Sequence, residues 1–420
     1  IRQKETGKNR QLCLKRGKAV HTVSKWNGKK DDSMKQKNFM ARYLQEITPV
    51  SFELETAEEF QIIGNGPAQF RVKLRREIPR RELLQSTSLA LGEAYARGDL
   101  EVDGDLYQVL DLFLGSMERF RTSRWALAGL LHTSLNEKKQ KEQVASHYDL
   151  GNDFYHLWLD ETMSYSCGYF QKEDTSLFEA QVGKVDHILK KLQLKPGMTL
   201  LDIGCGWGFL MKRAAVHYGV KAVGITLSQE QFEQVSREIE ENHLQDRMTV
   251  KLMDYRELKD SGMMFDRAVS VGMLEHVGRG HYGLFLEAVQ QVLEPGGLFL
   301  LHYISAQKEH PGDPWIRRYI FPGGVIPSLR EIVNLLPEQN FYLLDGESLR
   351  LHYTKTLLCW RENFLKHREE LEKERGQEFV RMWELYLASC AAAFHNGIVD
   401  LHQLLLSKGV NNELPMIRTV

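Results

Sequence analysis

The chain has 420 residues, of which 42% are hydrophobic and 26% are charged, and its formal net charge is −1. These totals fit a globular protein of two or three domains and argue against a general polyanion binder, and no apolar run approaches the roughly 20 residues of a membrane span. Five scattered cysteines without a C-x-x-C pair argue against disulfides and zinc and fit a reducing cytoplasm.

Residues 1–37 form a basic segment with 12 Lys/Arg against 3 Asp/Glu and no apolar period. This composition predicts a disordered tail, and without an apolar core we expect no secretory signal in it. Met34 and Met40 are candidate natural starts, which would make the segment an inert remnant. The alternative is weak attachment to anionic lipid.

Residues 38–123 predict a small α+β domain. Alternation between Ala57 and Leu83, as in Phe70–Leu74, indicates short strands. A helix ends at Arg97-Gly98, and residues 106–120 have helical spacing. By itself this part shows no catalytic constellation.

Residues 124–144 are polar and predict a linker to a catalytic domain over 145–420. Two segments at its start, 147–155 and 163–170, are dense in aromatic and small polar residues without a clear period. Such a composition is typical of a pocket wall or lid, and the alternative is a cap that packs its aromatic rings on the main domain.

Regular alternation of strands and helices dominates the rest of the chain. After a helix over 181–192, the strands are expected at 199–203, 221–225, 248–253, 266–271 and 298–302, and the intervening helices at 209–218, 229–242 and 282–293. Further helices are expected at 329–336, 352–371 and 379–394, with a strand inside 342–351. The alternation predicts an α/β fold with a doubly wound parallel sheet, whose ligands bind beyond the carboxyl ends of the strands.

The segment Leu200–Gly208 carries the sharpest single motif, an acidic residue, Asp202, before Gly-x-Gly-x-Gly. The spacing differs from the Gly-x-Gly-x-x-Gly of dinucleotide sites. It suits S-adenosylmethionine (SAM), because a carboxylate can hold the cationic amine and glycines let a ligand approach the backbone. The alternative is a strand–helix turn without a ligand.

Seven motifs together resemble the cyclopropane-fatty-acyl-phospholipid synthases, relatives of the mycolic acid cyclopropane synthases, from about residue 38 to the C-terminus. They are Glu93–Asp103, His147–Phe154, Met163–Phe170, Leu201–Gly208, Gly224–Gln231, Ser270–Gly278 and Trp315–Gly324. The resemblance implies a Rossmann-like, SAM-dependent methyltransferase sheet. The small N-terminal domain resembles the extra domain of the phospholipid-acting members.

By this resemblance, four segments hold the methyl donor SAM. They comprise Tyr165, Ser166, Leu200, Leu201, Asp202, Ile203, Gly204, Cys205, Gly206, Trp207, Gly208, Thr226, Leu227, Ser228, Gln229, Glu230, Gln231, Tyr255 and Arg256. No carboxylate follows the second strand to hold the ribose, which is the family's own variation. Tyr255 can stack on the adenine.

The implied reaction transfers a methylene from SAM to a cis double bond of an unsaturated phospholipid acyl chain and leaves a carbocation, which bound bicarbonate deprotonates as the ring closes. The matching catalytic positions are Cys167, Glu275, His302, Tyr353 and the backbone of Ile304, with Cys390 as a further candidate. Thiol, imidazole, phenol and backbone N–H groups can donate to a small anion. We expect Glu275 to orient that anion through His302 and to relay the proton.

Each catalytic candidate has a structural alternative. His302 could be a satisfied core histidine, Glu275 an acid near a helix N-terminus, and Tyr353 a packing aromatic. Cys390 precedes three alanines on a helix, which favours a core role, because a thiolate would itself be methylated by a sulfonium.

The resemblance also implies a cytoplasmic homodimer, peripheral on the inner face of the membrane, without a metal or nucleic acid. Residues 315–321 and 165–170 are expected to wall the acyl chain, and Arg75, Arg76, Arg80 and Arg81 to touch anionic lipid or to form a solvated face. Two alternatives keep the fold: a lipid C-methyltransferase and a small-molecule N-methyltransferase. A third is a catalytically silent lipid-binding protein.

Overall fold

The computed structural model describes residues 39, 42–44, 50–57, 59–116 and 150–417. The basic segment 1–37 and the linker 124–144 therefore lie outside the described residues. The chain divides into two units, Ile1–Phe39 and Met40–Val420, and every element named below belongs to the second.

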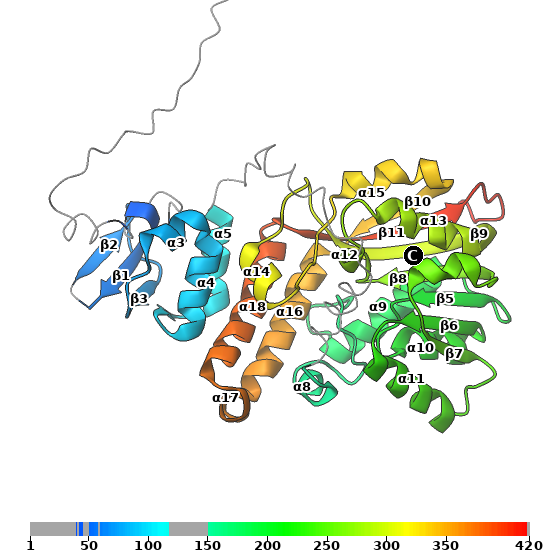
Figure 1. Ribbon diagram of the computed structural model, residues 1–420, viewed down its shortest axis with the longest axis horizontal. Helices are drawn as coiled ribbons and strands as arrows, with labels where there is room; N and C mark the ends of the chain where they lie inside the picture. Colours follow the sequence, from blue (N-terminus) through cyan, green and yellow to red (C-terminus); the bar gives the residue numbers. More distant parts are fainter. Residues whose placement is uncertain (1–38, 40–41, 45–49, 58, 117–149, 418–420) are drawn as a thin grey trace, which may run out of the picture. The chain divides into compact units, whose positions relative to one another are not determined.

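A four-stranded sheet with three helices forms the N-terminal part of this unit (Figure 1). The strands, in the order β2-β1-β3-β4, are β1 (Phe52–Thr56), β2 (Phe60–Ile63), β3 (Arg71–Leu74) and β4 (Leu100–Asp103), and the helices are α3 (Arg80–Gln85), α4 (Thr87–Arg97) and α5 (Leu106–Ser116). The short strands expected between residues 57 and 83 are β2 and β3, and α3 begins in the same region after Pro79, in a run of good helix formers.

A seven-stranded sheet in the order β10-β11-β9-β8-β5-β6-β7 forms the centre of the larger part. Its strands are β5 (Thr199–Ile203), β6 (Lys221–Thr226), β7 (Met248–Leu252), β8 (Phe265–Val271), β9 (Leu293–Ser305), β10 (Phe341–Ser348) and β11 (Asp400–Lys408). The strands from β7 to β9 are parallel, as expected. Towards one edge the sheet becomes antiparallel, because β11, a strand that was not expected, pairs antiparallel with both β9 and β10.

Helices cover both faces of this sheet (Figure 1). One face carries α9 (Leu177–Lys191), α10 (Phe209–Tyr218) and α11 (Gln229–Glu241), and the other carries α12 (Leu274–Val277), α13 (Tyr282–Val292) and α15 (Leu329–Leu335). Successive residues of one strand point to opposite faces of the sheet: Leu300 packs towards α9, and Leu301 packs towards α13. This is the doubly wound α/β architecture that the alternation predicted.

The remaining elements surround the carboxyl ends of the strands or connect the sheets. They are α8 (Asn152–His156), α14 (Pro314–Tyr319), α16 (Arg350–Lys366), α17 (Arg368–Arg375), α18 (Gln377–His395) and the short 3₁₀ helices η1 (Tyr255–Asp260) and η2 (Pro337–Gln339). The helix expected over 352–371 is broken at His367, where φ is −102° and ψ is 13°. Among the described residues, no helix is long and apolar enough to cross a membrane.

Candidate active site

The glycine motif adopts a backbone that requires glycine. Gly204, Gly206 and Gly208 have φ values of 81°, 56° and 82° between β5 and α10. A Cβ on Gly204 would lie 3.2 Å from Met273, and one on Gly208 would lie 3.0 Å from Val235. The turn is therefore tight on its inner side, and no side chain caps the first turn of α10.

A buried ion cluster lies beside this turn. Burial raises the pKa of Asp202, at the end of β5, to about 7, although the charge of Lys184 lowers it. Burial lowers the pKa of Lys184, on α9, to about 8, opposed by Asp160, Cys167 and Asp202. The Lys184 ammonium donates to Ser166 Oγ at 2.9 Å. Lys184 thus bonds to Ser166 and acts electrostatically on Asp202, two residues expected at the SAM site, and Asp202 is suited to a cationic amine.

The segment after β6 is held rigid by its own side chains. Thr226 Oγ1 donates to Gln231 Oε1 at 2.8 Å, and Ser228 caps α11 by accepting from the Gln231 backbone N–H at 3.3 Å. Leu227, Gln229 and Glu230 lie between them. The polar groups at this strand end therefore stand in a fixed arrangement.

The other expected SAM residues already have protein partners. The Tyr255 ring is 5% exposed and packs edge-on against Phe285, and Arg256 donates to both carboxylate oxygens of Asp254, at 2.8 and 2.6 Å. Trp207 Nε1 donates to Asn152 of α8 at 3.1 Å. The Tyr165 hydroxyl lies 2.7 Å from that of Tyr386.

Glu275 and Ile304 form one unit. The Ile304 backbone N–H, which the resemblance assigned to bicarbonate, donates here to Glu275 Oε1 at 2.6 Å. Glu275 Oε2 is buried and has no hydrogen-bond partner among the described residues. Burial raises the pKa of Glu275 to about 7, against the opposing hydrogen bond from Ile304. Glu275 is therefore partly protonated at neutral pH.

His302 lies two residues before Ile304 on β9, and its side chain is 1% exposed. Its Nδ1 is 3.1 Å from Gln403 Nε2, whereas its Nε2 has no partner within the described part of the chain. Burial, together with the nearby charges of Lys184 and Lys191, lowers the pKa of His302 to about 3. The ring is therefore neutral at physiological pH.

Cys167 and Tyr353 are both buried and kept protonated. Burial raises the pKa of each well above its usual range. Tyr353 lies close enough to Cys167, Glu275 and Cys390 for their charges to act on its pKa. The Cys167 thiol donates to Gly168 O at 3.2 Å and lies 3.8 Å from Leu349 O. Both groups remain donors rather than anions.

Aromatic rings from α16 and from the segment between α8 and α9 gather beside these groups. The Tyr165 ring is 5.4 Å from Trp360 and 5.3 Å from Trp158, and the Tyr353 ring is 6.0 Å from Trp360. Trp158 and Trp360 are fully buried. Sequence reasoning identified the two tyrosines but missed Trp360, which lies on α16, the same helix as Tyr353.

Two further residues expected at the site, Cys390 and Trp315, are both shielded from solvent to a large extent in the structure. Burial raises the pKa of Cys390 to about 12, so its thiolate is not accessible at neutral pH. Trp315, expected in the acyl-chain wall, is 3% exposed, and a Cβ on Gly92 of α4 would overlap its ring. In this structure Trp315 packs on the N-terminal part.

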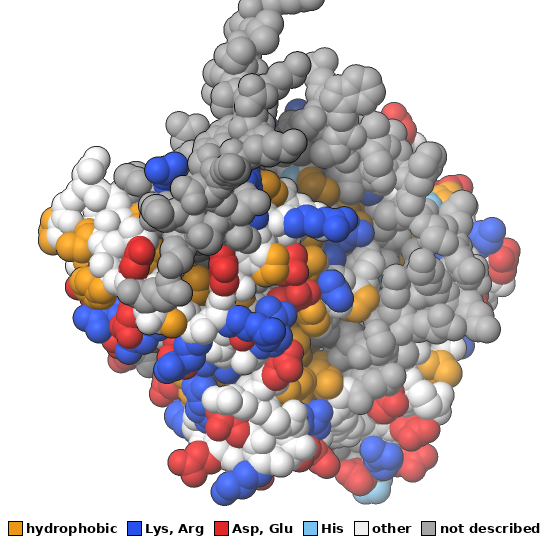
Figure 2. Space-filling model, turned by 60° about the vertical axis from the view of Figure 1, so that its left-hand side comes forward, with side chains coloured by type: hydrophobic (Ala, Val, Ile, Leu, Met, Phe, Trp, Pro, Cys, Tyr) orange, Lys and Arg blue, Asp and Glu red, His pale blue; other side chains and the backbone are white. Residues whose placement is uncertain are grey.

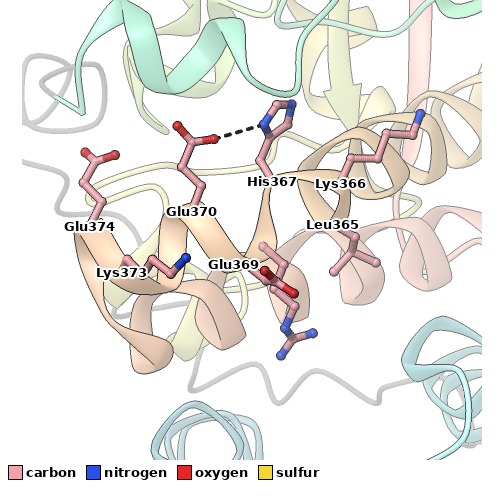
Figure 3. Close-up of a pocket in the computed structure, with 8 residues that line it drawn as sticks. Leu365, Lys366, His367, Glu369, Glu370, Lys373 and Glu374 are labelled. Carbon is pink, nitrogen blue, oxygen red and sulfur yellow. Dashed lines mark hydrogen bonds and ion pairs between the residues drawn. The ribbon is translucent and has the colours of Figure 1, made fainter.

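An open depression lies on the surface beside the α16–α17 junction (Figure 3). None of the expected site residues lines it. Charged side chains line it, and His367 Nδ1 lies 3.3 Å from Glu370. Figure 2 shows positive and negative side chains interspersed over the face that it presents. No cluster of three His, Cys, Asp or Glu suited to a metal ion occurs within the described ranges.

Three buried polar residues near the site were missed from the sequence: Lys184, Lys191 and Gln403. Lys184, His187 and Lys191 recur at the spacing of one helix face, together with the core residues Val185 and Ile188. Lysines on the apolar face of a helix are a usable signal, because lysine is rarely buried without a partner. Gln403 gives no such signal.

Comparisons with known proteins identify the family. A family model described as mycolic acid cyclopropane synthetase matches residues 135–404, and a model of a domain of unknown function matches residues 36–124. The chain is 39% identical over 380 residues to the cyclopropane-fatty-acyl-phospholipid synthase of Escherichia coli K12, covering 88% of this chain and 95% of that one.

Solved structures agree with this assignment. The cyclopropane synthase MmaA2 from Mycobacterium tuberculosis matches with a TM-score of 0.60 and 36% identity, covering 64% of this chain and 98% of that one. The mycolic acid cyclopropane synthase CmaA1, complexed with SAH and CTAB, matches with a TM-score of 0.60 and 34% identity over the same shares. The expected family and fold are confirmed. This chain belongs to the mycolic acid cyclopropane synthase family and is, by family and fold, a SAM-dependent methyltransferase.

Proposed function

We propose that this enzyme converts the cis double bond of unsaturated phospholipid acyl chains into a cyclopropane ring, with the methylene taken from SAM and bound bicarbonate as the base. The observation that carries the proposal is a pair of buried atoms, Glu275 Oε2 and His302 Nε2, without partners among the described residues. Buried polar atoms normally have partners, so the pair favours a small polar ligand at the end of β9. The printed names of the relatives favour ring formation.

The residues at the glycine motif fit SAM. The turn from Gly204 to Gly208 leaves backbone N–H groups at the start of α10, and Asp202 offers a buried carboxylate to a cationic amine. CmaA1 was solved with SAH, the demethylated form of SAM, and shares this fold. When bound, SAM supplies an electrophilic methyl group, which the alkene of the acyl chain attacks. The expected SAM-binding residues at the strand ends are part of this proposal.

The group formed by Cys167, Glu275, His302 and Tyr353 suits a bicarbonate anion, because these side chains carry little negative charge. Cys167 and Tyr353 keep their protons, His302 is neutral, and Glu275 is partly protonated at pH 7. Three of these groups can donate to an oxyanion, and a Glu275 carboxylate oxygen can accept the O–H of bicarbonate. The repulsion expected between Glu275 and an anion is therefore small. Its pKa near 7 also suits Glu275 to take up and release the proton lost by the transferred methyl group.

The aromatic rings supply what a cationic transition state needs. The rings of Tyr165 and Tyr353 both contact Trp360, which is fully buried, and aromatic ring faces stabilise positive charge by cation–π attraction. A dry site also prevents water from capturing the carbocation on the acyl chain before the ring closes. This favours ring formation over an alcohol.

Further parts of the proposal concern the setting of the enzyme. We infer peripheral binding to the inner face of the membrane and a homodimer in the cytoplasm. The N-terminal part exposes Phe60, Ile62 and Leu84 to 56%, 57% and 60%, and Arg76 and Arg81 are also exposed there. Exposed apolar side chains together with basic ones suit anionic lipid.

Expression in a host that lacks its own cyclopropane synthase tests the reaction. Mass spectrometry of the host phospholipids should show acyl chains heavier by one CH₂, and proton NMR should show cyclopropane signals. Glu275→Gln and His302→Asn should abolish the product but retain SAH binding, whereas Glu287→Gln, at an exposed position of α13, should not change it. Methyl or methylene branches would favour the C-methyltransferase, and N-methylated small molecules would favour the N-methyltransferase. Unchanged turnover after removal of bicarbonate would contradict the proposed base.

A further inference from the structure

His302 lies on β9, which pairs antiparallel with β11, and β11 pairs antiparallel with β10 (Figure 1). Gln403 of β11 lies opposite His302 of β9, and Glu347 of β10 lies opposite Gln403, so the three residues form a row. Residues directly opposite in neighbouring strands point to the same face of the sheet. The helix α9 packs on that face and brings Lys191, which is 6% exposed, to the row.

Hydrogen bonds join the row from end to end. Lys191 Nζ donates to Glu347 Oε2 at 2.5 Å and to Gln403 Oε1 at 3.1 Å, and Gln403 Nε2 lies 3.1 Å from His302 Nδ1. The Gln403 side chain is fully buried, and His302 is 1% exposed. Bulk water therefore does not compete for the contact between Gln403 and His302.

The contacts fix the direction of each hydrogen bond. A lysine ammonium has three donors and no acceptor, so the Gln403 atom that faces Lys191 must be the carbonyl oxygen. The amide nitrogen of Gln403 then faces His302 and can only donate, so His302 Nδ1 must accept. Because a neutral imidazole carries one proton, that proton is on Nε2.

The Lys191 ammonium, at one end of this row of hydrogen bonds, cannot turn away from Gln403 without losing other partners. Lys191 lies 3.5 Å from Asp345 as well as 2.5 Å from Glu347, and Glu347 also contacts His187 Nε2 at 2.6 Å. Although burial raises the pKa of Glu347, its contacts with His187 and Lys191 lower it to about 2. Glu347 is thus an anion at physiological pH and holds Lys191 in place.

We propose that Gln403 and Lys191 are positioning residues that hold His302 as the tautomer protonated on Nε2, so that its unpartnered Nε2–H donates to an anion in the active site. The identity of that anion, bicarbonate, rests on the proposed function, but the tautomer does not. In the opposite tautomer, the lone pair on Nε2 would face the anion and repel it. The antiparallel pairing of β11 with β9 thereby determines the donor at the catalytic end of β9.

NMR of histidine ring nitrogens in isotope-labelled protein tests the tautomer without any turnover. The chain has 15 histidines, so the His302 signals are identified by their loss in His302→Asn. We expect the wild type to carry the proton on Nε2. Gln403→Glu keeps the side-chain size and the pairing with Lys191 but offers only acceptors, so the proton should move to Nδ1 or occupy both nitrogens.

Two lysines on α9 form a matched pair for this experiment. Lys191→Met removes the cation that orients Gln403, so both tautomers should appear, whereas Lys190→Met, at the exposed neighbouring position, should leave the spectrum unchanged. A wild-type His302 protonated on Nδ1 would overturn the proposal, as would an unchanged tautomer in a folded Gln403→Glu variant. Thermal melting of each variant identifies the folded proteins.

Kinetics separate this inference from the proposed function. Gln403→Glu should raise the apparent KM for bicarbonate at least about tenfold, because a donor to the anion is lost. The affinity for SAH, measured by calorimetry, should not change. If the NMR result holds but bicarbonate has no effect on turnover in the wild type, the proposed base is wrong and the tautomer assignment remains. An unchanged KM for bicarbonate in a variant with the switched tautomer would contradict the role of His302 Nε2.

Discussion

Glu275→Gln should stabilise the folded protein at high pH while it abolishes turnover. The pKa of Glu275 is raised by burial from 4.5 to about 7. A carboxyl group with a raised folded-state pKa supports the fold when protonated, and that support is lost as the pH rises through about 7. Glutamine has no charge to bury and can still accept the hydrogen bond from the Ile304 N–H.

The magnitude follows from the same two pKa values. Each pKa unit corresponds to about 1.4 kcal/mol, so the wild type should lose up to about 3 kcal/mol of unfolding free energy between about pH 4.5 and pH 8, relative to the variant. At about pH 5 the two proteins should be nearly equal in stability. Such a cost at a functional residue is expected where activity requires a buried titratable group.

Urea unfolding followed by tryptophan fluorescence provides the assay. Trp158, Trp360 and Trp383 are buried to 98% or more, so their emission reports on this part of the fold. The experiment compares the wild type, Glu275→Gln and the exposed control Glu287→Gln from about pH 5 to about pH 8.5. A stability difference between the wild type and Glu275→Gln that does not grow with pH would refute the reasoning, as would a variant that is less stable than the wild type at about pH 8.5.

Three other changes should have measurable effects. Gly224→Ala places a Cβ in contact with Met211 Sδ and should lower the unfolding free energy in urea by about 1–3 kcal/mol, whereas Gly283→Ala, where nothing lies within 4 Å, should lower it by no more than about 0.5 kcal/mol. Asp202→Asn should weaken SAM binding in calorimetry at least about tenfold. Wild-type affinity should fall as the pH drops through about 7, where Asp202 gains a proton, and a variant that retains this step would contradict the role of Asp202. Arg381→Met removes the buried guanidinium that donates to the carbonyls of Tyr95 and Leu100 and should cost about 2 kcal/mol or more in urea unfolding, and no change would contradict this.

Local pattern was sufficient for most of the sheet. The strands from β5 to β8 and the helices α9 to α11 were placed within a few residues, because buried parallel strands appear as short apolar runs and covering helices have a clear period. The strand β9 begins earlier than expected, at Leu293, and continues through a Pro-Gly-Gly sequence that is typical of a turn. The pairing with β8 shifts register from Phe265–Leu293 to Arg267–Leu298, so residues 294–297 stand out of the ladder and Gly296 keeps a positive φ of 73°.

The edge of the sheet was not predictable in this way. The segment Asp400–Lys408 contains His402 and Gln403 within an apolar run, and no local feature shows that it inserts between β9 and β10. Its partners lie about a hundred residues earlier on β9 and about sixty residues earlier on β10. Only the packed sheet makes this strand necessary, because it completes the hydrogen bonds of β9.

The sequence by itself determined the α/β alternation, the glycine turn with Asp202 and the set of residue types at the strand ends, because these depend on neighbouring residues and on the chemistry of single side chains. The tertiary structure decided which buried groups form hydrogen bonds with one another and how burial and neighbouring charges shift their pKa values. Gln403 meets His302 across 101 positions, and it meets Lys191 across 212. The tautomer of His302, the charge around Asp202 and the raised pKa of Glu275 arise from burial and from contacts between distant segments, and these exist only once the chain has folded.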